Sequence, residues 1–434
     1  MKSEKTAIVW FTTDLRLKDN ETLKKACDAY KTVLPVFIFQ PYWFQLTPFG
    51  TRKTGVFRYA FIKEAVLDLK KSLKELGGDL LIQFGRPEYV LYELVKTFKA
   101  EKVFVKKEVA HEELQIQKSV SEQLIKHQAE LEVFSTSTLF HPDDLPFSIK
   151  NIPEVFTTFR KKVEKESGIR LCFPAPESIS LPSSVPLDQW PSEELMPETH
   201  NLNIPAHTSF PFKGGESEAD KRLNYYFHES KLISYYKETR NGMAGIDYSS
   251  KFSPWLAMGC ISPRSIYHEL KKFEQQNGSN DSIYWLFFEL MWRDYFRFLM
   301  KKNSYAYFLK QGIKPEFKHA EDHKPELFEK WKCGDTGMQV IDAAMKELKQ
   351  TGFMSNRARQ LVASYLVNDL KSDWRYGAAH FEEMLIDYDV CSNWGNWAYL
   401  AGVGNDPRGK RFFDINKQTE VYDKDAVYRN LWLN

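Results

Sequence analysis

The stretch AIVWFTTDLRLKDNETLKKACDAYKTVLPVFIF, residues 7–39, decides the fold class. Its apolar runs at 7–11 and 33–39 are typical of buried strands, and the segment near 20–30 between them is typical of a helix. This alternation continues and predicts a parallel sheet covered by helices. No G-x-G-x-x-G pattern is present, so the sheet is not an obvious dinucleotide site. Further strands are expected at 79–85, 102–107 and 131–139, and further helices near 53–76, 87–99 and 111–128.

The remainder of the chain divides into a proline-rich zone and a helical zone. Eleven of the 20 prolines lie between Pro142 and Pro211, and proline interrupts both helices and central strands. PFKGGESEADKRL then predicts a turn and a helix capped near Ser217 and Glu218, and helical periodicity continues afterwards, as in YWLFFELMWRDYFRFLMKK. We therefore expect an α/β plus all-α protein: a Rossmann-like parallel-sheet domain at 1–140, an inter-domain linker at 141–216 and an all-helical domain at 217–434.

The composition limits the classes of function. The net charge is +2, so binding to a phosphate backbone has to use a local patch rather than bulk charge. Aromatic residues reach 15%, which fits either a large helical core or stacking surfaces for a cofactor or bases. The 5 cysteines are scattered without metal spacing, and no signal peptide or membrane span is apparent. This pattern favours a cytoplasmic protein without a metal site.

Two helical segments place polar side chains on one face. Glu289, Trp292 and Arg293 lie at i, i+3 and i+4 in a mostly apolar helix, where they are costly to bury without partners. They form either an ordinary surface ion pair or a site, and the pattern leaves both open. Asn356, Arg359 and Gln360 share a second polar face, with Arg357 adjacent, and this group by itself is typical of a solvated face.

Two further stretches suit a bound cofactor. Ser249, Ser250 and Ser253 surround a lysine at the start of a helix, where hydroxyls and backbone N–H groups can hold a phosphate, although an ordinary N-cap has the same pattern. In IDYDVCSNWGNWAYLAGVGNDPRG (386–409), paired carboxylates at Asp387 and Asp389 precede Asn393 and Trp397, while no His, Ser or Cys nucleophile has an evident partner. These residues indicate a cofactor site without naming the cofactor.

These stretches resemble the photolyase/cryptochrome family over nearly the whole chain. VWFTTDLRLKDNETL, SSKFSPWLAMGCISPR, ELMWRDYFRF, SNRARQLVASYLVNDL, DWRYGAAHFEEMLIDYD and SNWGNWAYLAGVGNDPRG follow in the order and spacing of that family. LFHPDDLPF (139–147) and GVGNDPRG (402–409) are similar to the cryptochrome DASH branch. One departure is FTTDLR (11–16), where the family commonly has Arg after Phe.

The resemblance implies FAD, held in a U shape within the helical domain. The flavin would be gripped by its polar edges, with Asn393 facing N5, and Asp387 with Arg359 would form a charge-assisted pair. The residues that match the cofactor contacts of the family are Tyr236, Ser249, Ser250, Lys251, Phe252, Ser253, Glu289, Arg293, Asn356, Arg359, Asp387, Asp389 and Asn393.

The resemblance also implies an activity, the light-driven splitting of cyclobutane pyrimidine dimers by an electron from excited reduced flavin. Glu289 matches the residue that hydrogen-bonds the dimer, and Trp292 the aromatic that packs on it. Arg240 and Arg357 match phosphate contacts at the rim. Trp397 and Trp374 match the first two members of a tryptophan electron chain. No Trp lies between Trp292 and Trp331 to match the third, so photoreduction would be slower or use another route, such as a Tyr.

Two positions bear on the substrate. Tyr399 and Gln360 stand where classical bacterial photolyases have Trp and Met, which makes the pocket more polar and reduces stacking. We therefore expect repair of dimers preferentially in single-stranded DNA, where no base pair has to be broken. The alternative is a blue-light photoreceptor that signals through the redox state of its flavin. A (6-4) photolyase is disfavoured, because Asn393 has no adjacent His in these stretches.

The family also implies an antenna chromophore, which in the DASH branch is usually 5,10-methenyltetrahydrofolate bound between the domains. Glu112 is the candidate contact, although a solvated helix glutamate has the same pattern. We further expect a monomer whose partner is DNA.

Overall fold

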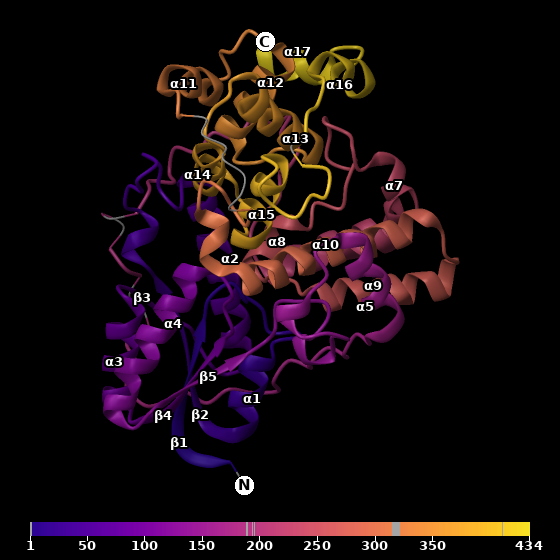
Figure 1. Cartoon of the computed structure of the whole chain (residues 1–434). Helices are drawn as coiled ribbons and strands as arrows, with labels where there is room; N and C mark the ends of the chain where they lie inside the picture. Colours follow the sequence, from indigo (N-terminus) through magenta and orange to yellow (C-terminus); the bar gives the residue numbers. More distant parts are fainter. Residues whose placement is uncertain (1, 188–189, 193, 195, 315–321, 410) are drawn as a thin grey trace.

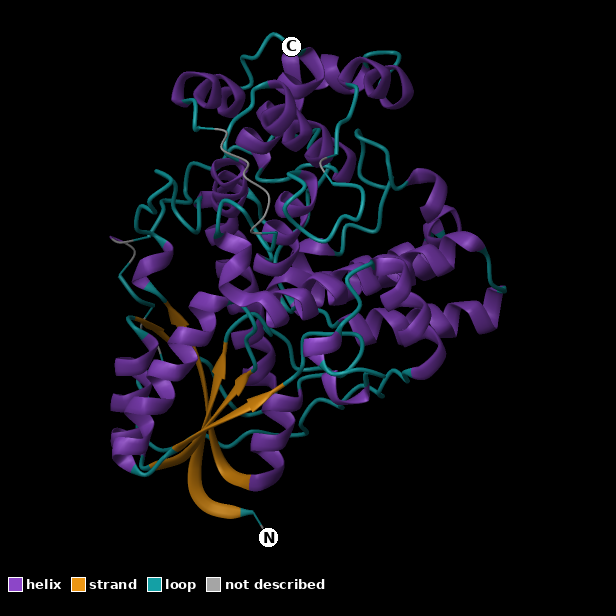
Figure 2. Cartoon of the chain, viewed as in Figure 1, coloured by secondary structure: helices purple, strands orange, loops and turns teal. Residues whose placement is uncertain are grey.

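The computed structural model describes residues 2–187, 190–192, 194, 196–314, 322–409 and 411–434 (Figure 1). Its amino-terminal part is a five-stranded parallel sheet in the order β3-β2-β1-β4-β5. The carboxyl ends of the strands point toward the helical part of the molecule (Figure 2). The strands are β1 (Ser3–Phe11), β2 (Tyr30–Phe39), β3 (Leu81–Phe84), β4 (Ala100–Lys106) and β5 (Glu130–Phe134).

Both faces of the sheet are buried, as expected for a parallel sheet with helical crossovers. Along β1, Val9 and Phe11 join the larger core that continues into the helical part, whereas Ile8 and Trp10 join a second core that includes residues of α3 and α4. The crossover helices are α1 (Glu21–Ala29), α2 (Val56–Glu75), α3 (Pro87–Phe98) and α4 (His111–Leu124). The α/β architecture predicted from the sequence is therefore confirmed.

The last strand is shorter than the predicted segment 131–139, because β5 ends at Phe134. The residues that follow serve the helical part instead. The Asp294 carboxylate accepts hydrogen bonds from the backbone N–H groups of Leu139 and Phe140, at 3.0 and 2.9 Å. An apolar run that reads as one strand is thus divided between the sheet and an inter-domain contact.

The proline-rich zone is not entirely irregular. It contains α5 (Phe156–Glu166) and short 3-10 turns, while positions 188–189, 193 and 195 lie outside the described residues. The predicted cap at its end was wrong: α6 begins at Glu216, with Gly215 as N-cap, and Ser217 donates its hydroxyl to Asp68 on α2 at 2.5 Å.

The carboxyl-terminal part consists of helices joined by turns and loops, and its described residues contain no strand. The central helix α10 contacts α5, α7, α9 and α15, and α2 connects the sheet to α6 and α14 (Figure 1). The helices are α6 (Glu216–Asn224), α7 (Tyr236–Thr239), α8 (Ser253–Met258), α9 (Pro263–Asn277), α10 (Asp281–Asn303), α11 (Pro325–Cys333), α12 (Gln339–Thr351), α13 (Asn356–Ser364), α14 (Trp374–Met384), α15 (Val390–Leu400), α16 (Ile415–Tyr422) and α17 (Val427–Leu433).

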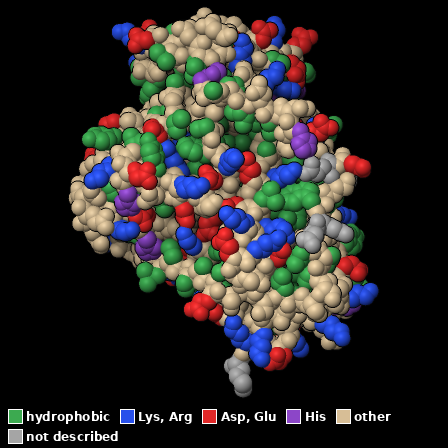
Figure 3. All heavy atoms as spheres, turned by 180° about the vertical axis from the view of Figure 1, so that it is seen from behind, with side chains coloured by type: hydrophobic (Ala, Val, Ile, Leu, Met, Phe, Trp, Pro, Cys, Tyr) green, Lys and Arg blue, Asp and Glu red, His purple; other side chains and the backbone are tan. Residues whose placement is uncertain are grey.

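The surface matches the near-neutral charge. Basic and acidic side chains are interspersed over the face seen in Figure 3. In the described ranges, no helix is both long and apolar enough to cross a membrane.

Candidate active site

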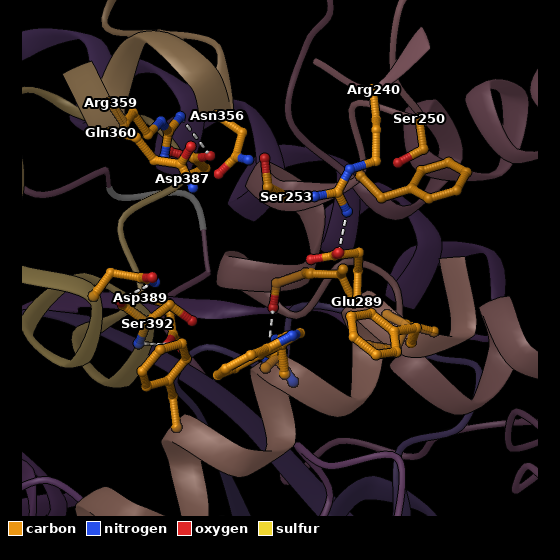
Figure 4. A pocket seen from close by; sticks show the side chains of 18 of the residues that line it. Arg240, Ser250, Ser253, Glu289, Asn356, Arg359, Gln360, Asp387, Asp389 and Ser392 are labelled. Atoms are coloured by element: carbon orange, nitrogen blue, oxygen red, sulfur yellow. Dashed lines mark hydrogen bonds and ion pairs between the residues drawn. The ribbon is translucent and has the colours of Figure 1, made fainter. Parts of the chain in front are cut away.

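A cavity of about 460 Å³ lies among α8, α10, α13 and α15, and a chamber of about 220 Å³ adjoins it. The segments that resemble the cofactor and substrate contacts of the family meet at these two spaces, although they are far apart in the sequence (Figure 4). The predicted residues that line one or both spaces are Tyr236, Arg240, Ser249, Ser250, Lys251, Phe252, Ser253, Glu289, Trp292, Arg293, Asn356, Arg359, Gln360, Asp387, Asp389 and Tyr399.

One wall is formed by α13 and the segment before α15. Arg359 donates from Nη2 to Oδ2 of Asp387 at 2.9 Å, so the structure contains the charge-assisted pair expected from the sequence. The other oxygen of Asp387, Oδ1, is buried and has no hydrogen-bond partner within the protein. Gln360 Oε1 has none either. Both acceptors therefore suit a bound molecule that brings hydroxyl or amino donors.

The chamber is lined by the serine-rich segment before α8. Lys251 has a left-handed backbone with φ of 64° and is 2% exposed. Its ammonium has no hydrogen-bond partner within the protein and lies 3.2 Å from the ring centroid of Tyr248. Burial holds the pKa of Lys251 well below its ordinary value. Glu347 opposes this lowering only in part. A buried cation without a hydrogen-bonded anion is costly, so this position fits a negatively charged ligand group.

The opposite wall belongs to α10. Glu289 forms an ion pair with Arg240, which reaches it from the end of α7 (Figure 4). Burial raises the pKa of the Glu289 carboxyl, and Arg240 opposes that rise. Arg293 does not pair with Glu289, because its guanidinium donates to the backbone carbonyls of Ser137 and Leu256 at 2.5 and 3.3 Å. The reading of Glu289 and Arg293 as an intrahelical surface pair was therefore wrong.

The helix α15 supplies the floor. Asp389 caps it by accepting the Ser392 N–H at 2.8 Å. Burial alone would raise the pKa of Asp389, but Arg293 and Arg297 hold it below its ordinary value. Asn393, expected to face the flavin, does not line the cavity in this structure.

The side-chain amide of Asn393 donates to the Ala378 carbonyl of α14 at 2.9 Å. The residues of α15 that do line the cavity are Ser392, Asn396, Tyr399 and Leu400, and the first three follow Asp389 at helical spacing. Ser392 and Asn396 were missed, although helical spacing from Asp389 could have identified them.

The aromatic residues of the wall are held by neighbours. Trp292 stacks on Phe156 of α5 with ring centroids 3.7 Å apart, and meets Tyr399 edge to face at 6.1 Å. The Tyr399 hydroxyl accepts a hydrogen bond from Arg411 Nη2 at 2.6 Å. Arg411 also lines the cavity and pairs with the buried Asp406. Neither Phe156 nor Arg411 was predicted, because their roles arise only from tertiary contacts.

Arg357 is placed differently from Arg240. It does not line the cavity, and its guanidinium donates to Asn241 and Gln418 at 3.1 and 3.4 Å. It also lies 4.3 Å from the ring centroid of Tyr422. A phosphate contact by Arg357 would thus have to compete with α16.

The two predicted electron-chain tryptophans are buried on neighbouring helices. Trp397 packs on Phe381 and Trp331, with centroid distances of 5.1 and 6.3 Å. Trp374 packs edge to face on Trp394 at 5.8 Å, and its indole N–H donates to the Lys310 carbonyl at 3.0 Å.

Glu112 lies on α4, half exposed, and pairs with Lys53 at 2.6 Å. Lys53 also pairs with Glu382 of α14 at 3.1 Å. The adjacent Glu113 has its pKa raised to about 7 by burial and by Glu108. Within the described ranges, no group of three or more His, Cys, Asp or Glu side chains could hold a metal ion.

The polar side chains of the two spaces fit FAD. The combined spaces are within the range of cofactor pockets, which is about 300–1,000 Å³. The unpartnered Lys251 ammonium suits a diphosphate, and the unpartnered Asp387 oxygen suits an amino or hydroxyl group.

Comparison with known proteins agrees with this geometry. A DNA photolyase family model matches residues 7–178, and a model of the FAD binding domain of DNA photolyase matches residues 285–434. Cryptochrome DASH of Synechocystis sp. is 45% identical over 431 residues, which cover 99% of this chain and 87% of that protein.

Two solved structures extend the comparison. The crystal structure of the Synechocystis cryptochrome aligns with a TM-score of 0.95 at 45% identity, and covers 100% of this chain and 89% of that chain. A bacterial class III photolyase from Agrobacterium tumefaciens aligns with a TM-score of 0.85 at 26% identity, and covers 100% and 87%. The fold, the cavity and the identity over the full length lead to one assignment: this chain belongs to the cryptochrome DASH branch of the photolyase/cryptochrome family.

Proposed function

We propose that this protein is a deoxyribodipyrimidine photo-lyase that uses FAD and blue light to split cyclobutane pyrimidine dimers, preferentially in single-stranded DNA. One observation carries the proposal: a single cavity is lined both by the residues expected to hold FAD and by those expected to meet the dimer. Bound reduced FAD would supply the excited electron. The protein residues then have to bind the dimer beside it and exclude water.

The cavity wall offers one group for each task. Glu289 would accept the hydrogen bond of a pyrimidine N–H, since Arg240 favours its ionised form. Trp292 would present an apolar surface whose orientation is fixed by Phe156. Tyr399 and Gln360 make the remaining wall polar, so stacking of a flipped dimer would stabilise the complex less than the Trp and Met of classical bacterial photolyases would. We expect this deficit to penalise duplex DNA, in which base pairs must first be broken.

The tryptophans and the cofactor contacts complete the proposal. Trp397 and Trp374 would carry electrons from the protein toward oxidised FAD, and Lys251 with Ser249 through Ser253 would hold its diphosphate. Asn393, whose amide N–H donates to the Ala378 carbonyl, would face N5. We also propose the domain boundaries 1–140, 141–216 and 217–434, a monomeric state, a cytoplasmic location and a methenyltetrahydrofolate antenna near Glu112.

The test is repair of one thymine dimer by the purified, chemically reduced protein under blue light. The dimer is placed in a single-stranded oligonucleotide and in its duplex. Repair in the single strand with little repair in the duplex supports the proposal. Equal repair of both would contradict the strand preference. Bound FAD without repair of either would contradict the enzyme activity and favour a blue-light photoreceptor.

A further inference from the structure

Trp394 is a buried tryptophan beside the predicted electron chain to which the resemblance gives no role. It is 3% exposed and lies on α15, three residues before Trp397 and therefore on a similar side of the helix. Its ring meets Trp374 edge to face at 5.8 Å. A Cβ at Gly377, one turn after Trp374, would overlap the Trp397 ring. The three indoles are thus grouped around the start of α14.

The indole of Trp394 is connected to a carboxylate. Its Nε1 donates to Glu382 Oε2 at 3.2 Å, and Glu382 Oε1 lies 3.1 Å from the Lys53 ammonium. Lys53 also pairs with Glu112 at 2.6 Å. Side-chain exposure rises along this path, from 8% at Glu382 through 20% at Lys53 to 50% at Glu112. A polar path therefore leads from the buried indole to solvent.

The neighbouring indole has a different partner. Trp374 donates its N–H to the backbone carbonyl of Lys310. A carbonyl oxygen is a poor base, whereas a carboxylate can accept a proton outright. A positive charge on an indole is also stabilised more by an adjacent carboxylate than by a neutral dipole. Of these two indoles, Trp394 therefore stabilises an oxidised state better than Trp374 does.

We propose that Trp394 is the terminal electron donor of the tryptophan chain and that Glu382 accepts its proton. This inference rests on the proposed function. Blue-light-excited oxidised flavin is the electron acceptor, and the electron reaches it from Trp374 through Trp397. One electron then passes from Trp394 to the oxidised Trp374. The Nε1 proton moves to Glu382 Oε2, so the products are a neutral indolyl radical and a neutral carboxyl group. Return of the electron is favourable only if the proton also returns to Nε1, so charge separation lasts longer.

The test is transient absorption of the FAD-loaded protein after a blue flash, without an external electron donor. In the wild type, the tryptophan cation signal should convert to that of the neutral radical. E382Q keeps the shape of Glu382 but removes the base, so this conversion should slow by about 100-fold. W394F should shorten the lifetime of the charge-separated state.

W331F is the matched control. Trp331 is also buried and contacts Trp397, but its indole donates to the Val362 carbonyl at 3.0 Å. It should behave as the wild type. K53Q removes the ion pair while keeping Glu382, and should likewise retain formation of the neutral radical.

Wild-type kinetics in both E382Q and W394F would overturn the proposal. If E382Q does not fold, W394F decides alone. Repair by dithionite-reduced protein separates this question from the proposed function, since it bypasses the tryptophan chain. Reduced W394F should repair dimers as well as the wild type does. Absence of repair in every protein would refute the proposed function, while the radical kinetics would still decide the role of Trp394.

Discussion

Replacement of Lys251 by Met should stabilise the FAD-free protein and weaken FAD binding at the same time. The lysine is 2% exposed, and its ammonium has no hydrogen-bond partner within the protein. Effective desolvation of a buried ion costs several kcal/mol, and contact with the Tyr248 ring returns about 2 kcal/mol. Met preserves the approximate length of the side chain. The backbone strain at φ of 64° is the same for both residues, because both carry a Cβ. We therefore expect the FAD-free variant to be more stable by about 1–3 kcal/mol.

The pH dependence of folding also indicates that Lys251 destabilises the FAD-free protein. The folded pKa of Lys251 lies well below its unfolded value of 10.5. Folding of the FAD-free wild type is therefore penalised at pH values below the folded pKa, and this penalty shrinks as the pH rises toward 10.5. K251M should lose this part of the pH dependence.

Binding of FAD should change in the opposite direction. A hydrogen bond to a charged group contributes about 1.5–3 kcal/mol, so the variant should bind FAD roughly 10- to 100-fold more weakly. Urea unfolding of FAD-free protein and titration of flavin fluorescence measure the two quantities. K70M is the control, because Lys70 pairs with Asp79 at 2.5 Å and lies outside the cavity lining. It should destabilise the protein without changing FAD affinity. A destabilised K251M with unaltered FAD affinity would refute the reasoning.

Three further changes test the cavity. Arg240→Gln removes the cation that lowers the pKa of Glu289, so this pKa should rise further. As the pH falls, affinity for a single-stranded dimer should then be lost at a higher pH than in the wild type, and an unshifted curve of binding against pH would contradict this. Asn356→Ala should release FAD more readily, and purified protein that keeps its full yellow colour would argue against a cofactor contact there. Tyr399→Trp restores stacking next to Trp292, so the ratio of duplex to single-strand repair should rise about 10-fold, and an unchanged ratio would show that this wall does not limit flipping.

Local sequence patterns predicted much of this fold. Each helix or strand buries one or both of its faces, and this burial sets the spacing of its apolar residues. The starts of α1, α3 and α4 fall within two residues of their predicted positions. Patterns failed where one segment serves two partners. Residues 135–139 leave the sheet because Asp294 holds the backbone of Leu139, and no local signal reveals that contact. The cap at Ser217 failed for the same reason, since Asp68 attracts its hydroxyl.

The site shows a similar division. The pair of Asp387 and Arg359 could be expected because both positions match the segments that line the cofactor in the family that the chain resembles. Arg411 could not, since its role depends on Tyr399 and Asp406 lying beside it. Asn393 shows the limit of carrying a role over by position. Its amide donates to the Ala378 carbonyl, and a match by position does not reveal that contact.

The electrostatics of the cavity bear on the expected strand preference. Three of its arginines are paired with carboxylates, Arg240 with Glu289, Arg359 with Asp387 and Arg411 with Asp406, and the fourth, Arg293, donates to backbone carbonyls. A nucleic acid that enters must therefore exchange protein partners for its own phosphates and bases, which reduces the net gain per contact. With a net charge of +2, bulk attraction adds little. Duplex DNA has to recover the free energy of two broken base pairs from this modest gain, whereas a single strand does not. We therefore expect these engaged cations to favour substrates whose bases are already unpaired, which supports the proposed strand preference.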